Sequence, residues 1–230
     1  MKKTITYFLV MLFGITLSAQ SNLQFTSPCT DTLINTCATI NDEVTLSASA
    51  MTDCSPDPTL TFGYQIDENN DGSVDIWGFG DSYTDVFSIG EHRVTFTVAD
   101  ECNNTISCEY LFSLGDFEPP TPVGFNGLTT VIIPSSGLLT LYASDFDSGN
   151  STDNCTDAQD LIFSFSSDTN DTTLNNICDV LFSNNCGIIS LEIWVTDEAG
   201  NQDFYLIYIL VQDPNWVCGC NFFPPLLPSI

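Results

Sequence analysis

The sequence is almost without basic residues. Its 230 residues include 30 aspartates and glutamates but only 3 lysines and arginines and 1 histidine, which gives a formal net charge of −27. Sequence-independent binding to nucleic acid depends on basic side chains that displace the counterions of the phosphates. Anionic lipid headgroups attract basic segments in the same way. The composition therefore excludes nucleic acid and anionic membranes as partners of this kind.

Long apolar runs are also scarce, and the clearest one lies at the N-terminus. Lys2 and Lys3 precede the run YFLVMLFGITL, and Ser18 and Ala19 follow it. The run is shorter than the ~20 residues that a membrane span needs. A basic start, a short apolar stretch and small residues at its end are typical of a secretory signal peptide. We expect residues 1–19 to be removed and the protein to be secreted, extracellular or displayed at the cell surface.

The chain has 10 cysteines, and in an exported protein cysteines are expected to form disulfides. Their spacing resembles no zinc module, and the one histidine has no Cys-x-x-Cys partner. Cys54 and Cys102 flank the same core region of the first half of the chain, as do Cys37 and Cys108. We therefore predict the disulfides Cys54–Cys102 and Cys37–Cys108.

The sequence contains an internal repeat. Four blocks of the first half recur in the same order in the second half, and three of them alternate apolar and polar residues as in β-strands. Two adjacent prolines near residue 119 mark the junction between the repeats. The matched blocks are VTLSAS from Val44 with LTLYAS from Leu139, TDC from Thr52 with TDNC from Thr152, LTFGYQID from Leu60 with LIFSFSSD from Leu161, and FTVADECNN from Phe96 with IWVTDEAGN from Ile193.

Repeats of about 100 residues with short, alternating strands favour an immunoglobulin-like architecture. We predict an all-β fold of two tandem immunoglobulin-like antiparallel β-sandwiches, stabilised by disulfides. The first domain is expected at 20–115 and the second at 116–217. An apolar, proline-rich C-terminal tail follows at 218–230.

The ends of both repeats resemble a known family. V-A-D-E-C-N-N at 98–104 and V-T-D-E-A-G-N at 195–201, together with D-x-x-P-P at 116–120, resemble the HYR and related immunoglobulin-like repeats of secreted bacterial surface proteins of the Bacteroidetes type. Such modules serve as spacers, adhesive repeats and fibre units. The resemblance implies an immunoglobulin-like fold and a place in a surface structure.

An acidic loop in the first repeat resembles a calcium site. The pattern D-x-N-x-D-G-x-x-D from Asp67 matches the first half of an EF-hand loop, in which oxygen ligands alternate. Position 12 of the loop is Gly78, where an EF-hand has its bidentate glutamate. The alternative is a plain acidic turn, since Asn-Asn-Asp-Gly also favours a β-turn. The candidate Ca²⁺ ligands are Asp67, Asn69, Asp71, Ser73 and Asp75.

Two further acidic groups are weaker candidates for calcium. Asp145, Asp147 and Asp153 lie in one loop of the second repeat and could converge on an ion, although a solvated loop explains them as well. The second group consists of carboxylates at strand ends that could face the junction of the repeats. Its members are Asp100, Glu101, Asp197 and Glu198, near Asp116 and Glu118.

The sequence offers little for catalysis. His92 is the only side chain with the ordinary pKa of a general base near neutral pH, and we expect it at the surface or in a turn. No G-x-S-x-G motif is present, so we predict that the protein is not an enzyme. Trp77, Phe79 and Tyr83 cluster after the acidic loop and could stack on a sugar, but we expect them in the core and strands.

We predict a calcium-stabilised structural protein, a subunit of an extracellular fibre, matrix or surface layer. The alternative is a secreted adhesin or carbohydrate-binding module. The expected partners are further copies of the chain, joined head to tail, or other matrix and surface components. In head-to-tail assembly the apolar tail would pack on the next molecule. The alternative is that the tail folds back over the second domain of its own chain. The tail side chains that would carry it are Phe222, Phe223, Leu226, Leu227 and Ile230.

Overall fold

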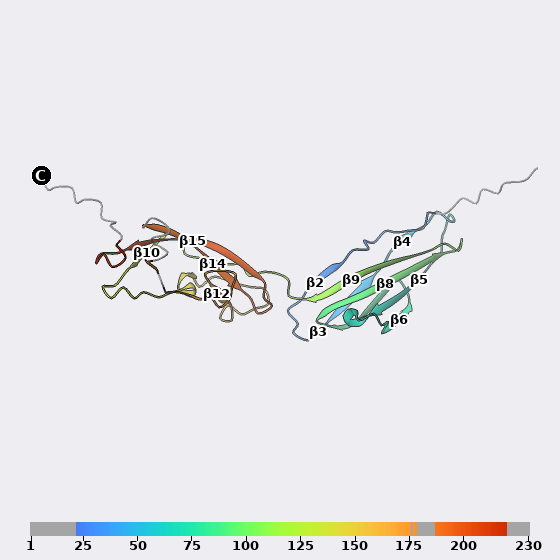
Figure 1. Cartoon of the computed structure of the whole chain (residues 1–230). Helices are drawn as coiled ribbons and strands as arrows, with labels where there is room; N and C mark the ends of the chain where they lie inside the picture. Colours follow the sequence, from blue (N-terminus) through green and yellow to red (C-terminus); the bar gives the residue numbers. More distant parts are fainter. Residues whose placement is uncertain (1–21, 176, 179–186, 220–230) are drawn as a thin grey trace, which may run out of the picture. The chain divides into compact units, whose positions relative to one another are not determined.

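The computed structural model describes residues 22–175, 177, 178 and 187–219 (Figure 1). The predicted signal peptide at 1–19 and the tail residues Phe222, Phe223, Leu226, Leu227 and Ile230 lie outside the described residues, so both remain predictions. Among the residues described, no helix is long and apolar enough to cross a membrane.

The first half of the chain folds into β-strands with one short 3-10 helix, η1 (Glu68–Asn70). The strands form a five-stranded sheet in the order β2-β9-β8-β5-β6 and two-stranded sheets of β3 with β7 and β1 with β4. The strands are β1 (Gln24–Phe25), β2 (Thr32–Asn35), β3 (Asn41–Ser47), β4 (Ala50–Met51), β5 (Leu60–Asp67), β6 (Ile76–Phe79), β7 (Ser82–Ser88), β8 (Gly90–Asp100) and β9 (Thr105–Gly115).

The second half repeats this plan. Its larger sheet has the order β10-β15-β14-β12, and β11 pairs with β13 in a smaller one. The elements are β10 (Leu128–Ile132), β11 (Leu141–Tyr142), the 3-10 helix η2 (Ala143–Phe146), β12 (Ile162–Ser164), β13 (Thr173–Leu174), β14 (Ile188–Thr196) and β15 (Gln202–Gln212).

These sheets confirm the predicted all-β, immunoglobulin-like, disulfide-stabilised fold. The pairings described are antiparallel apart from one at the edge of each large sheet, where β2 joins β9 and β10 joins β15 in parallel. The repeated alternating sequence blocks therefore form equivalent strands in the two halves, as the repeat predicts.

The chain divides into two compact units. The first contains the described residues up to 31 together with 45–85 and 92–111, and the second contains 32–44, 86–91 and the described residues from 112 onward. The second unit thus includes segments from both halves of the sequence, and the domain boundary expected after residue 115 stays a prediction. A hydrophobic core within the second unit consists of Ile133, Leu141, Ala143, Phe146, Ile177, Ile189, Ile193, Ile207, Ile209, Val211 and Cys218.

The histidine lies in the core, so its predicted place at the surface or in a turn is wrong. His92, Val94, Phe96 and Val98 alternate along β8, and each is 0% exposed. Because side chains on a strand alternate between faces, His92 shares the buried face of its apolar neighbours. Its Nδ1 accepts a hydrogen bond from the Asn69 amide at 3.1 Å. The histidine therefore connects η1 to the buried face of β8.

Four disulfides join the described cysteines, and each lies within one unit. Cys54 and Cys102 bond to each other, as the sequence predicts, with Cα atoms 6.0 Å apart. The predicted Cys37–Cys108 pair is wrong, because Cys108 bonds to Cys29 and Cys37 bonds to Cys155. The fourth pair is Cys178–Cys218.

The register of β2 explains the error. This strand runs parallel to β9 with Thr32 opposite Phe112 and Asn35 opposite Gly115. Extending that register places Cys29 level with residue 109, next to Cys108. Cys37 is then level with residue 117, beyond the end of β9, and cannot reach the same sulfur.

Candidate functional site

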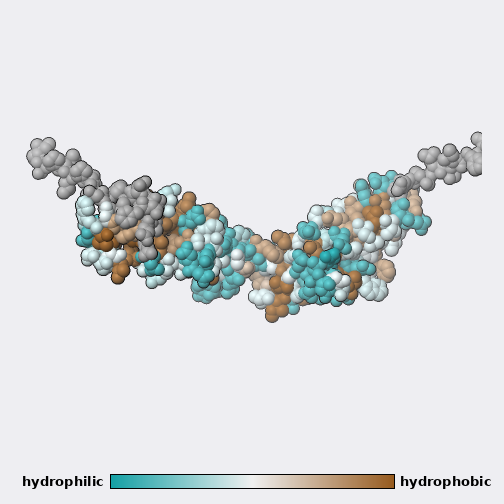
Figure 2. All heavy atoms as spheres, in the orientation of Figure 1, coloured by the Kyte–Doolittle hydropathy of each residue, from teal (hydrophilic) through white to brown (hydrophobic). Residues whose placement is uncertain are grey.

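The most exposed aromatic side chains of the described residues lie on β6. Hydrophobic residues reach the surface in many places (Figure 2), but Trp77 and Phe79 stand out with exposed fractions of 70% and 80%. Their predicted place in the core is therefore wrong, although they do belong to a strand. Strand β6 is the edge strand of its sheet and has only β5 as a neighbour there.

The pairing of β5 with β6 determines which way these rings point. Ile66, which is 0% exposed, pairs with Ile76 and faces the core. The next pair along the ladder, Gln65 with Trp77, must point to the opposite face because side chains alternate. Phe79 lies two residues beyond Trp77 and shares that outer face, opposite Gly63. The sheet therefore presents two adjacent aromatic rings to solvent.

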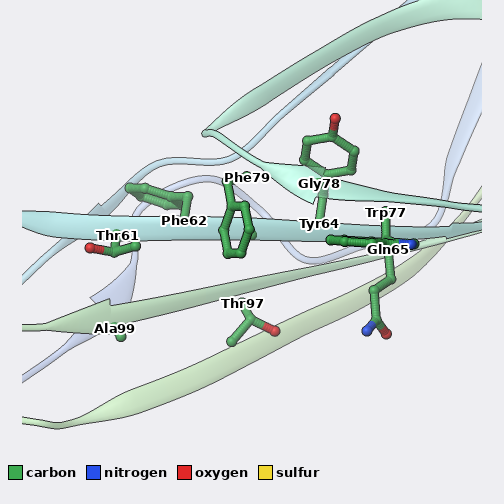
Figure 3. A pocket seen from close by; sticks show the side chains of 10 residues that line it. Thr61, Phe62, Tyr64, Gln65, Trp77, Gly78, Phe79, Thr97 and Ala99 are labelled. Carbon is green, nitrogen blue, oxygen red and sulfur yellow. The ribbon is translucent and has the colours of Figure 1, made fainter.

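A shallow groove of about 390 Å³ lies along these rings, and Figure 3 shows Phe79 and Trp77 next to one another over β5. Gly63 pairs with Phe79 on one side and Thr97 on the other. A Cβ at Gly63 would lie 3.9 Å from the Phe79 ring, so a glycine here keeps the middle of the groove open. The lining residues are Thr61, Phe62, Gly63, Tyr64, Gln65, Trp77, Gly78, Phe79, Thr97 and Ala99.

The polar groups of the groove are neutral hydrogen-bonding groups. The hydroxyls of Thr61 and Thr97 can donate and accept, and the Gln65 amide offers both functions as well. None of the lining residues is a carboxylate, a histidine, a cysteine or a basic residue. The groove thus combines apolar plates with uncharged polar groups, a lining suited to binding and without catalytic groups.

Tyr83, the third aromatic residue of the sequence cluster, does not join the groove. It lies on β7, in the sheet with β3, and its ring lies 4.8 Å from that of Tyr64. Its hydroxyl donates to Asp85, and this hydrogen bond raises the pKa of Tyr83 to about 12. Figure 3 shows Tyr64 pointing away from Trp77 and Phe79. Of the three aromatic residues that cluster in the sequence, Trp77 and Phe79 therefore line the groove, and Tyr83 lies in another sheet.

The acidic loop after β5 is a turn whose carboxylates are occupied by backbone amides. Asp67 Oδ1 accepts from the Asp71 amide and Oδ2 from the Gly72 amide, both at 2.9 Å. Asp75 accepts from the Glu68 amide, and Asp71 accepts from the Ser73 amide. These contacts are those of the acidic turn that the sequence analysis kept as an alternative.

The loop carboxylates do not converge. Asp67, Asp71 and Asp75 are not among the groups of three acidic, imidazole or sulfur ligands found within 4.8 Å of one another in the described chain. The backbone N–H of Asn69 donates a hydrogen bond to His92. Calcium at Asp67, Asn69, Asp71, Ser73 and Asp75 stays a prediction.

The second predicted calcium group is also separated. Asp147 accepts hydrogen bonds from the Ser151 hydroxyl at 2.6 Å and the Gly149 amide at 3.0 Å. Asp153 instead meets Asp116 and Asp197, and carboxylate oxygens of these three lie within 4.8 Å of one another. Asp145 is not part of this group. The structure therefore brings together Asp153 from the predicted loop with Asp116 and Asp197 from the predicted strand-end group.

One other group of potential ligands converges among the described residues, formed by Cys54, Asp100 and Cys102. Both of its sulfurs belong to a disulfide, which removes the thiolates that a metal would need. The three aspartates are thus the remaining candidate for a metal centre in the part of the chain that the structure describes.

The sequence matches no protein-family model and no curated protein. Among solved structures it is similar to the fibronectin(III)-like modules of Clostridium thermocellum CbhA, at 13% identity and a TM-score of 0.29, covering 84% of this chain and 95% of that one. It is also similar to Drosophila N-cadherin EC1-4, at 11% identity and a TM-score of 0.29, covering 84% of this chain and 49% of that one.

A third similar structure is the Bacteroides ovatus mixed-linkage glucan utilization locus protein SGBP-B in complex with a mixed-linkage heptasaccharide. The identity is 13% and the TM-score 0.26, over 82% of this chain and 47% of that one. The chain spans about half the length of this structure and of the cadherin. At these identities and TM-scores, the similarity identifies neither a family nor a ligand for this protein.

Proposed function

We propose that the protein is a secreted, non-enzymatic binding module, an adhesin, whose groove along β6 binds a neutral glycan. The observation that carries this proposal is the outward display of Trp77 and Phe79, which are 70% and 80% exposed on one face of one strand. Adjacent large aromatic rings left in water mark interaction sites, and they are the residue types that dominate binding energy where they become covered. The disulfides fit an oxidising, extracellular setting.

The chemistry of the groove favours an uncharged sugar. A pyranose ring presents C–H groups on its faces and hydroxyls at its rim, so it can pack on an aromatic plate while its rim forms hydrogen bonds. Thr61, Gln65 and Thr97 lie where such hydroxyls would need partners. The chain carries a formal charge of −27, which would repel acidic glycans.

The test is glycan binding by matched variants. The wild-type protein is screened on an array of neutral and acidic glycans, and hits are measured by calorimetry with the Trp77→Ala and Phe79→Ala variants. Each replacement should weaken binding at least about tenfold, which corresponds to about 1.4 kcal/mol, since large aromatic anchors at the centre of a binding site commonly contribute about 2 kcal/mol or more. Trp194→Ala is the control, because Trp194 stacks on Phe204 in the sheet of the other unit. Undiminished binding by both groove variants would refute this role.

A structural role in a fibre, matrix or surface layer is the second proposal. It depends on the C-terminal tail, where residues 221–230 contain no acidic residue in an otherwise acidic chain. Such an apolar end could pack against a second copy and give an open, head-to-tail assembly. Deletion of residues 221–230 should abolish filaments seen by electron microscopy, and filaments formed by the truncated protein would contradict the proposal.

A further inference from the structure

We propose that Asp116, Asp153 and Asp197 bind one calcium ion. Asp116 follows β9, Asp153 lies in the loop before β12, and Asp197 follows directly after β14. All three belong to the second unit, and carboxylate oxygens of the three lie within 4.8 Å of one another. The proposal concerns a different site from the aromatic groove and does not depend on glycan binding.

Hydrogen bonds to neighbouring groups hold each carboxylate in place. Asp153 Oδ2 accepts from the amides of Cys155 and Thr156, both at 2.8 Å. Asp116 Oδ1 accepts from the Glu118 amide at 3.3 Å. In both residues one oxygen is therefore bound to backbone and the other oxygen is left over.

Asp197 is held by Asn201. Its Oδ1 accepts from the Asn201 amide at 2.7 Å and its Oδ2 from the Asn201 side chain at 2.8 Å. The same side-chain nitrogen donates to the backbone oxygen of Asp116 at 3.1 Å. One asparagine thus connects two of the three aspartates and fixes their separation.

The oxygens left over point to a missing ligand. Asp116 Oδ2 and Asp153 Oδ1 each expose less than 1 Å² and have no hydrogen-bond partner. Among the described residues, the only other buried side-chain atom in this state is the Tyr205 hydroxyl. Buried carboxylate oxygens without a partner are costly and rare, and an unseen ion is one of the explanations for them.

The charge at this place also needs a counter-ion. Three ionised carboxylates with oxygens within 4.8 Å of one another repel one another strongly where water is largely excluded. Arg93 is the one basic side chain among the described residues, and it pairs with Glu109 at 3.1 Å. No lysine or arginine of the described residues therefore neutralises the three aspartates.

The ligand set fits calcium. Carboxylate oxygens are hard ligands, and Ca²⁺ accepts six to eight oxygens in flexible geometry, whereas Mg²⁺ requires a near-ideal octahedron. Water and backbone oxygens would complete the shell around the three aspartates. The other acidic loops offer a contrast, because both oxygens of Asp67 and of Asp147 are bound by backbone or hydroxyl donors, whereas Asp116 and Asp153 each keep one oxygen without a partner.

The first experiment is calcium binding by the full secreted protein, measured by calorimetry after treatment with chelator. The wild-type protein should bind Ca²⁺, and Asp153→Asn should raise the Kd at least tenfold. Asp53→Asn is the matched control, since Asp53 occupies the equivalent place in the first repeat and accepts a hydrogen bond from the Asn22 amide. Equal affinity in wild type and Asp153→Asn, or loss of the ion in Asp67→Asn/Asp71→Asn instead, would overturn the proposal.

A second experiment separates an ion site from a merely structural contact. In chelator, Asp116→Asn should raise the melting temperature, because its amide can donate to the remaining carboxylates where the aspartate repels them. At a hundredfold excess of calcium over the wild-type Kd, wild type should gain about 5 °C or more and the variant little. A variant that melts lower than wild type to the same extent in both solutions would contradict calcium binding.

Discussion

The ends of β8 and β14 are equivalent in the two repeats and have the same aspartate–asparagine hydrogen bonds, but different groups lie next to them. In the first unit, Asp100 Oδ1 accepts from the Asn104 amide at 2.9 Å, and in the second, Asp197 Oδ1 accepts from the Asn201 amide at 2.7 Å. The side-chain nitrogen of each asparagine also donates to its aspartate. This aspartate–asparagine clamp is the shared part of the two repeats.

What faces the clamp differs. In the first unit the Thr52 hydroxyl donates to Asp100 Oδ2 at 2.9 Å, and the Cys54–Cys102 disulfide closes the loop beside it. In the second unit the clamp faces Asp116 and Asp153. The equivalents of Cys54 and Cys102 are Cys155, which bonds to Cys37, and Ala199. No disulfide therefore joins these two positions in the second repeat, where the clamp instead faces a concentration of negative charge. One position of the scaffold can thus be stabilised by a covalent bond or, as we propose, by an ion.

The largest effect is expected from breaking the covalent closure. The Cys54–Cys102 bridge spans 48 residues, and a loop of that size corresponds to about 4 kcal/mol of stabilisation in the chain-entropy description. Cys54→Ala/Cys102→Ala should therefore lower the free energy of unfolding by up to that amount, measured by guanidinium titration. The loss should be the same with calcium and with chelator. A loss that depends on calcium would show that the two closures are not independent.

The next effect is removal of calcium, which should act on the second unit alone. An ion present at 100 times its Kd stabilises the native state by about 2.7 kcal/mol. Chelator should accelerate amide hydrogen exchange around Asp197 and Asn201 while leaving the residues around Asp100 and Asn104 unchanged. Equal acceleration at both strand ends would contradict the difference drawn between the repeats.

The shared clamp should respond alike in both repeats when calcium is absent. Asn104→Ala and Asn201→Ala each remove a side-chain donor to a carboxylate, a change that costs about 2 kcal/mol for hydrogen bonds to charged groups. Thermal unfolding in chelator should show similar losses for the two variants. In calcium, only Asn201→Ala should also weaken ion binding, because Asn201 positions Asp197 and the backbone of Asp116.

The sequence predicts those features that depend on local pattern. The alternation of apolar residues in 92–98 corresponds to the buried face of β8, and the repeated blocks correspond to equivalent strands. The expectation that Trp77 and Phe79 lie in the core is wrong because aromatic character alone does not show which face of a strand is covered. Their exposure follows from the pairing of β6 with β5, which turns both rings to the outer face of the sheet and depends on strand order and register.

Features that depend on register or on several distant segments could not be predicted from pattern. The choice of Cys29 over Cys37 as the partner of Cys108 depends on the parallel register of β2 with β9. The three converging aspartates come from separate loops, and their meeting requires the folded backbone. Equivalence within the repeat was the available signal, since Asp153 corresponds to Asp53 and Asp197 to Asp100.

The smallest effect is expected from Thr52, which is the neutral partner of the clamp in the first unit. Thr52→Val removes the hydroxyl that donates to Asp100 while keeping the side-chain shape. This variant loses one hydrogen bond to the carboxylate where Asn104→Ala loses two, so we expect a loss of about 1.5 kcal/mol, the lower end for bonds to charged groups. The Cys54 amide also donates to this hydroxyl at 3.2 Å, so the variant leaves one donor without its acceptor. Thermal unfolding should show a loss of this size in calcium and in chelator alike. Because the disulfide still holds the loop in the variant, a loss approaching that of the double cysteine variant would mean that the hydroxyl, and not the covalent bond, is the main closure of the first repeat.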